Sequence, residues 1–139
     1  MNSNKRGQIS TEYLIVVGFI SFLIITVLGI ALFYSTQIRE RIIFHQIESF
    51  AENVISSSES VFFAGEPSQA TISAYLPKNV QGIDIIGKDL LFNISTDAGV
   101  ANIAYSSKVE MEGTINSNEG VKTLTIVAQA DKVTISEST

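Results

Sequence analysis

The sequence predicts an α+β protein, with a long N-terminal helix followed by a small antiparallel, sandwich-like β-domain. Three observations support this fold class. No charged residue occurs between Glu12 and Arg39, a stretch dominated by Leu, Ile, Val and Phe. An apolar pattern with the period of an amphipathic helix comes next. After Pro67, short alternating runs are separated by Gly, Asn and Asp, which is typical of strands joined by turns.

The apolar stretch 13–34 predicts a membrane-spanning helix. At about 1.5 Å of rise per residue it crosses the ~30 Å hydrocarbon core of a bilayer, and only internal hydrogen bonding satisfies its backbone in lipid. Gly18 and Gly29 fall on nearly one helical face. Small residues allow close helix packing, and glycines could also mark points where the helix extends on assembly. A third reading is that glycine is simply frequent in such helices.

Beyond the span, the helix is expected to continue as an amphipathic stalk over about residues 35–60, within a helix covering 8–62. Five apolar residues share roughly 60° of arc: Ile43, Ile47, Phe50, Val54 and Val61. Five polar residues lie opposite: Arg41, His45, Glu48, Glu52 and Glu59. The serine run 56–58 indicates a helix end or linker, and Gly65 with Glu66–Pro67 should stop the helix.

Residues 66–139 are predicted to form the β-domain. The expected strands are 70–76, 83–86, 90–95, 100–105, 108–115, 121–130 and 133–135. Residues 87–89 and 116–120 should each close a hairpin, and 97–99 should form a turn. Such a small domain is near the lower limit for a self-sufficient core, so we expect it to cover the apolar stripe of the stalk.

A distinctive group of residues precedes the span. Its members are Lys5, Arg6, Gly7, Gln8, Ser10, Glu12 and Leu14. In order and spacing they resemble the class III signal peptide of archaeal type IV pilin-like proteins. The resemblance implies that a prepilin-type peptidase recognises Lys5 to Glu12, cuts between Gly7 and Gln8, and removes residues 1–7 as a leader. The helix that follows is then retained.

The resemblance also implies a function, that of a structural subunit of an extracellular type IV pilus-like filament. The precursor would cross the cytoplasmic membrane once, with its C-terminal domain outside, before joining a filament at the cell surface. Its partners would be copies of itself or related pilins, the peptidase, an assembly ATPase, a membrane platform and the lipid bilayer. Assembly would use Gln8, Glu12, Gly18 and Gly29. Glu12 would meet the amino group of a neighbour's Gln8, or else serve recognition alone at the membrane interface.

Two alternatives remain open at this stage. A monomeric, membrane-anchored module could bind a sugar, peptide or solid surface through exposed aromatics. Tyr75, Phe92 and Tyr105 are candidates, but strand alternation places at least some of them in the core. A minor pilin or pseudopilin of a secretion or DNA-uptake system would look the same in sequence, as would subunits for adhesion or motility. Asn93, in the triplet Asn93–Ile94–Ser95, is a possible N-glycosylation site.

Little in the sequence predicts an enzyme. The net charge of −5 argues against nucleic acid as a partner, and the absence of cysteine excludes thiolate chemistry. The single histidine, His45, falls on the polar helix face. Glu110 and Glu112 share a strand face, where a solvated surface explains them more simply than acid–base chemistry or cation binding. We therefore predict no catalytic residue, metal or cofactor.

Overall fold

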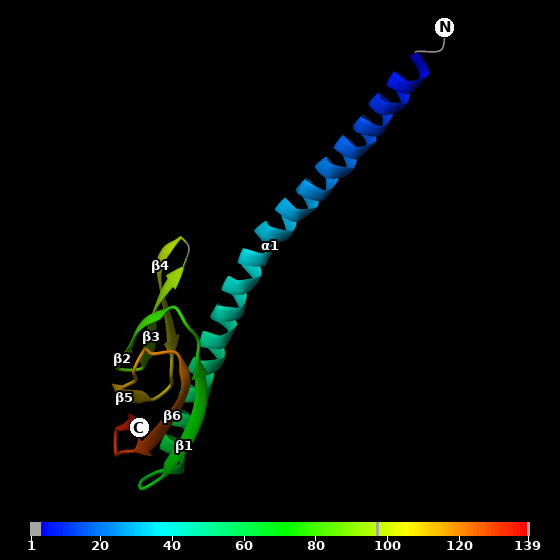
Figure 1. The fold of residues 1–139 in the computed structure, drawn as a ribbon. Coiled ribbons are helices and arrows are strands. Elements are labelled where there is room, and N and C mark those ends of the chain that lie inside the picture. Colours follow the sequence, from blue (N-terminus) through cyan, green and yellow to red (C-terminus); the bar gives the residue numbers. More distant parts are fainter. Residues whose placement is uncertain (1–3, 97, 139) are drawn as a thin grey trace. The chain divides into compact units, whose positions relative to one another are not determined.

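The computed structural model describes residues 4–96 and 98–138, with side chains for 10–35, 37–96 and 98–138. One α-helix precedes seven β-strands (Figure 1). The elements are α1 (Asn4–Ala64), β1 (Gln69–Leu76), β2 (Val80–Ile86), β3 (Asp89–Thr96), β4 (Gly99–Ser106), β5 (Glu110–Thr114), β6 (Gly120–Ala128) and β7 (Lys132–Ser138). The chain divides into two compact units, residues 1–39 and 40–139. The second unit contains the C-terminal part of α1 and all the strands.

Helix α1 is longer at both ends than the predicted 8–62. It begins at Asn4 because Lys, Arg and Gln are good helix formers. It ends at Ala64, where Gly65 takes the left-handed conformation with φ of +81° and donates its N–H to the Phe62 carbonyl at 3.0 Å. This is the usual glycine termination of a helix. The predicted stop at Gly65 and Pro67 is therefore confirmed.

The helix end or linker predicted at residues 56–58 is wrong, because these serines lie inside α1. Serine is disfavoured in helix interiors mainly because its hydroxyl competes for the hydrogen bonds of the backbone. Here the Ser58 Oγ donates to the Val54 carbonyl oxygen at 2.7 Å, and the Ser60 Oγ donates to Ser56 at 2.7 Å. These bonds satisfy the hydroxyls without breaking the helix, and Ser58 is fully buried.

The apolar stripe of the stalk is confirmed. Ile47, Phe50, Val54 and Val61 are buried against the strands and Ile43 is half-buried. Arg41, His45, Glu48 and Glu52 are exposed, as predicted. Glu59 is the exception. It is half-buried, and its Oε1 accepts the Lys108 backbone N–H at 2.9 Å because the connection after β4 runs beside it.

The strands form two sheets, which confirms the α+β class. One sheet has the order β1-β6-β7-β5 and the other has the order β2-β3-β4. The predicted hairpin around residues 87–89 is also confirmed. Strands β2 and β3 are antiparallel with Ile86 opposite Asp89, and Gly87 supplies the positive φ of +62° that the turn needs. Of the turn predicted at 97–99, residue 97 lies outside the described residues.

The hairpin predicted across residues 116–120 is wrong, and the largely antiparallel domain contains one parallel pair of strands. Strand β7 lies between β5 and β6, and β5 pairs with β7 in parallel. Strand β7 forms hydrogen bonds both with the connection between β5 and β6 and with β6 itself. The Glu137 carboxylate in β7 accepts the Asn116 N–H at 2.9 Å and the Lys122 ammonium at 2.8 Å. This pairing joins residues distant in sequence, so local periodicity could not indicate it.

Contacts between three aromatic rings join the stalk to the smaller sheet. The Phe50 ring on α1 meets Phe92 on β3 edge to face, with centroids 6.0 Å apart. Phe92 meets Tyr105 on β4 in the same way, also at 6.0 Å. Phe50 and Phe92 are 1 % and 0 % exposed. The stalk is thus part of the core of the second unit, which supplies the apolar burial that its strands alone would lack.

Candidate functional site

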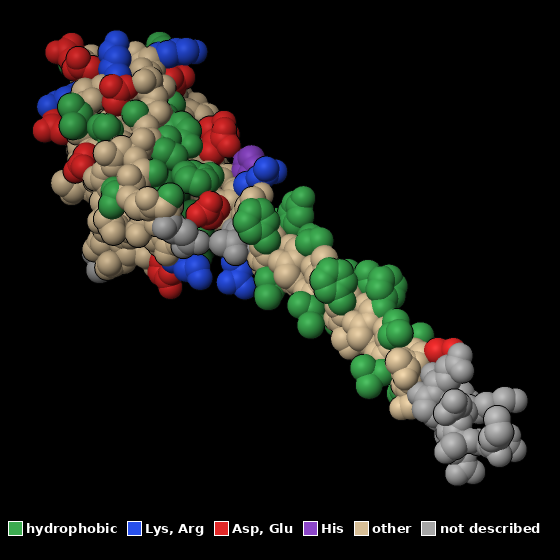
Figure 2. Space-filling view, turned by 90° about the horizontal axis from the view of Figure 1, so that it is seen from above, with side chains coloured by type: hydrophobic (Ala, Val, Ile, Leu, Met, Phe, Trp, Pro, Cys, Tyr) green, Lys and Arg blue, Asp and Glu red, His purple; other side chains and the backbone are tan. Residues whose placement is uncertain are grey.

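The most unusual surface in the described chain is the apolar part of α1 in the first unit. Each large apolar side chain from Tyr13 to Tyr34 is between 43 % and 72 % exposed. Figure 2 shows hydrophobic side chains along this part of the helix with no Lys or Arg among them. One helix is therefore long and apolar enough to cross a membrane. Fully exposing each such side chain to water costs about 1.5–3 kcal/mol, so this surface calls for a non-aqueous environment.

The residues of the signal-peptide motif lie at the N-terminal end of this surface. Ser10 and Glu12 are exposed on α1. The backbone of Lys5, Arg6 and Gly7 is helical and continuous with Gln8, whereas their side chains, and residues 1–3, fall outside the described positions. Glu12 is the last charged residue before Arg39. Its carboxylate therefore sits at the boundary where a membrane helix would leave the headgroup region.

Gly18 and Gly29 occupy open positions on α1. Apart from the adjoining residues and the nearby backbone of the helix itself, a Cβ atom added at either residue would find no described atom within 4 Å. Neither glycine has a positive φ among the described backbone angles. Glycine costs about 1 kcal/mol relative to Ala in a helix interior. Contacts within the described chain do not account for these two glycines, so close packing with other helices, helix extension and the general frequency of glycine in such helices all stay open.

A partly buried ion pair in the second unit was missed at the sequence level. The side chain of Lys122 is 8 % exposed, and its Nζ donates to Glu137 Oε1 at 2.8 Å. That hydrogen bond, followed by the one from the Asn116 N–H, lowers the pKa of Glu137. The alternation of residues in β6 could have indicated it, because that alternation places Lys122 on the inward face with Leu124 and Ile126.

The lowered pKa of Glu137 predicts an acid-sensitive contribution to stability. A depressed carboxyl pKa stabilises the fold above the unfolded value of about 4.3, and the contribution is lost as pH falls through the folded value. Glu137→Gln should lower stability at pH 7 by about 1–3 kcal/mol and flatten the pH dependence below about pH 5. Thermal unfolding of the full chain in detergent, followed by circular dichroism between pH 3 and 7, tests this. Glu119→Gln, which changes an exposed carboxylate in the adjoining loop, should leave both properties unchanged.

The other titratable candidates lie on solvated surfaces. The His45 side chain is 80 % exposed, with its Nδ1 3.3 Å from the Glu48 carboxylate. Glu112 forms an ion pair with Lys132, whose pKa is raised by that hydrogen bond. Glu110 is exposed on the same strand face. Among the residues described, no group of three or more His, Cys, Asp or Glu side chains could hold a metal ion.

The three aromatics considered for surface binding do not form a patch. Phe92 is fully buried, as expected for at least some of the three, and is therefore not available for surface binding. Tyr105 is half-buried against it. Burial, and then the charges of Glu48 and Glu52, raise its pKa. Only Tyr75 is substantially exposed, at 50 %.

Asn93, the possible glycan acceptor, lies within β3, the central strand of its sheet. Its side chain is half-buried, and its Nδ2 donates to Asp84 Oδ2 at 3.5 Å. Glycan acceptors are usually found in surface loops. A mature mass equal to that of the bare polypeptide would exclude modification at this position.

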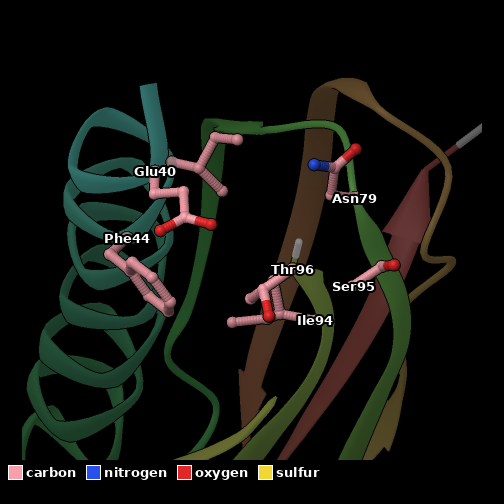
Figure 3. A pocket seen from close by; sticks show the side chains of 7 residues that line it. Glu40, Phe44, Asn79, Ile94, Ser95 and Thr96 are labelled. Atoms are coloured by element: carbon pink, nitrogen blue, oxygen red, sulfur yellow. The ribbon is translucent and has the colours of Figure 1, made fainter. Parts of the chain in front are cut away.

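A small cavity lies between the start of the stalk and the tip of the β3–β4 hairpin. Glu40 and Phe44 project toward it from α1, and Asn79, Ile94 and Thr96 lie on the opposite side (Figure 3). Its volume is about 30 Å³, which leaves room for about two water molecules.

No protein family, curated protein or solved structure matches this chain. The exposed apolar helix, the residues at its N-terminal end and the β-domain are therefore the features that bear on function.

Proposed function

We propose that the protein is a structural subunit of an extracellular, type IV pilus-like filament. A prepilin-type peptidase cuts the precursor before Gln8, and the retained helix first anchors the subunit in the cytoplasmic membrane. An assembly ATPase and a membrane platform then extract it, and its helix packs with those of other copies. The role is structural rather than catalytic.

The observation that carries this proposal is the contrast between the two parts of α1. The C-terminal part buries its apolar stripe in its own domain, whereas the N-terminal part exposes large apolar side chains around the helix. A lipid bilayer accommodates such a surface, and so does a bundle of like helices. Outside the membrane, the hydrophobic effect and close packing would hold those helices together.

The signal-peptide motif adds a reason to favour a filament over a permanent anchor. A basic pair and Gly7 precede the helix, and a glutamate occurs close to its start. A charge at the margin of the hydrocarbon region is stable when it stays at the interface or is paired. Cleavage before Gln8 would create an amino group on a neighbouring copy that could pair with Glu12.

The test is the amino-terminal sequence of the protein from native cells, in membranes and in material sheared from the surface. We expect the sheared protein to begin at Gln8. A chain that retains residues 1–7 and occurs only in membranes would contradict the proposal. That outcome would instead support a membrane-anchored surface module.

Glu12→Ala should separate processing from assembly. Cleavage before Gln8 should continue, whereas the yield of sheared filaments should fall at least about tenfold, because a loss of about 1.4 kcal/mol would weaken each subunit contact tenfold. Immunoblots of membrane and sheared fractions measure both quantities. Ser10→Ala, at a nearby exposed position without charge, is the control for assembly. Normal filament yield from Glu12→Ala would contradict the proposed pairing.

A further inference from the structure

The β-domain has two open strand edges, one in each sheet. Within residues 40–96 and 98–138, β1 and β4 each pair with a strand on one side only. The other two sheet edges, β2 and β5, come together where the Met111 N–H donates to the Gly87 carbonyl at 2.8 Å. In an antiparallel edge strand, every second residue directs its N–H and C=O away from the sheet. Strands β1 and β4 therefore both present unused backbone groups.

These two edge strands are also the only described strands without a charged residue. Strand β1 reads QATISAYL and β4 reads GVANIAYS, each of eight residues. Every other strand contains at least one of Asp84, Asp89, Glu110, Glu112, Lys122, Lys132 and Glu137. Proteins that remain monomeric usually place Lys, other charges or Pro on such edges to prevent pairing with another chain. Here the distribution of charge is the reverse of that protective pattern.

Part of β4 is covered and part is accessible. At its C-terminal end, Tyr105 and Ser106 line a depression together with Glu52 and Glu59 of α1. From Gly99 to Ala104 the outward side chains are exposed, and even the inward Ile103 is only half-buried. On β1 the outward side chains from Gln69 to Tyr75 are likewise exposed. An extended segment could therefore approach either edge.

We propose that the β1 edge of one copy pairs with the β4 edge of the next copy, so that the two sheets join across the subunit boundary. Pairing of β4 with β4 would form a closed dimer and leave β1 unpaired, and pairing of β1 with β1 would likewise leave β4 unpaired. Neither arrangement explains why both edges lack charge. A β1–β4 contact uses both edges and repeats without closing. It also brings acidic chains together at strands that carry no charge.

This inference rests on the proposed function in taking the partner to be a second copy, and it adds a contact between β-domains to the packing of the helices. Disulfide trapping can test it, because the chain contains no cysteine. Facing residues on neighbouring strands have Cα atoms about 4.5–5.5 Å apart, which is within the range that a disulfide spans. A full-length chain with Ser73→Cys is co-expressed with a differently tagged full-length chain carrying Val100→Cys, Asn102→Cys or Ala104→Cys.

After oxidation of membranes and sheared material, we expect a disulfide between the two differently tagged chains for at least one of the three β4 positions. A chain with both cysteines should give a ladder of oligomers. Dimers formed only within one tagged population, or no disulfide at all, would overturn the β1–β4 pairing. If sheared filaments form without the disulfide, the β1–β4 contact is wrong but the proposed filament function stands. If the disulfide forms in membranes of cells that shed no filaments, the contact is supported and the filament function is wrong.

A charge placed on the edge provides a second readout. Thr71→Lys, added to the chain that carries Ser73→Cys, should reduce the trapped product by at least tenfold. The matched control is Thr125→Lys, because Thr125 lies directly opposite Thr71 on the same outer sheet face but in the interior strand β6. Equal loss from both variants, or loss from neither, would contradict a contact at the β1 edge.

Discussion

Gly113→Ala should destabilise the β-domain by at least about 3 kcal/mol, which is a large fraction of the total stability of a typical domain. Gly113 has a φ of +149°, a conformation that residues with a side chain rarely adopt. An added Cβ would also collide with the backbone carbonyl of Ile135, lying 2.9 Å from its carbon atom. Because the obstacle is backbone in the paired strand β7, it cannot rotate away. Strand β5 would have to separate from β7.

Urea unfolding of the full chain in detergent, followed by the near-ultraviolet circular dichroism of its tyrosines, measures this loss. Gly82→Ala is the matched control in another strand. Its Cβ would approach only the Asn93 side-chain amide, at 3.2 Å, and Gly82 has no positive φ. A much smaller loss is therefore expected for Gly82→Ala. Equal unfolding midpoints for Gly113→Ala and the unmodified chain would contradict the parallel β5–β7 pairing.

Phe50→Ala should cost about 3–5 kcal/mol, the usual range for removing a buried aromatic side chain. Phe50 is 1 % exposed, and its ring contacts the Phe92 ring edge to face. Its loss would leave a cavity between the stalk and the smaller sheet. Because Phe92 also contacts Tyr105, the near-ultraviolet signal of that tyrosine should weaken before the domain unfolds.

Phe63→Ala on the same helix is the control for Phe50→Ala. Its ring is 70 % exposed, so unfolding in urea should change by no more than about 0.5 kcal/mol. A similar loss for both variants would mean that the stalk does not form the core with the strands.

The apolar surface of residues 13–34 has no cover in the described chain beyond its own helix, whereas the stripe from Ile47 to Val61 is covered by the strands. Removal of Phe50 should therefore weaken the packing of the strands on the stalk without altering the apolar surface of residues 13–34. Membrane association of the Phe50→Ala variant should be unchanged.

The sequence by itself determined the helix, the apolar span, the buried stripe of the stalk and most of the strands, because these follow from local periodicity. Val54 and Val61 could be assigned to a buried face since helix geometry places them there whatever covers them. The position of Glu12 at the start of the apolar run was equally plain, and its proposed pairing with Gln8 remains a prediction.

Only the tertiary structure decided which strands pair and which polar residues enter the core. The insertion of β7 between β5 and β6 depends on long-range contacts, such as the approach of Gly113 to Ile135, which no local pattern encodes. The same contacts bury Lys122 beside Glu137 and leave β1 and β4 as the open edges. Strand order is set by the packing of residues distant in the chain, and hydrophobic alternation specifies only which face of each strand is buried.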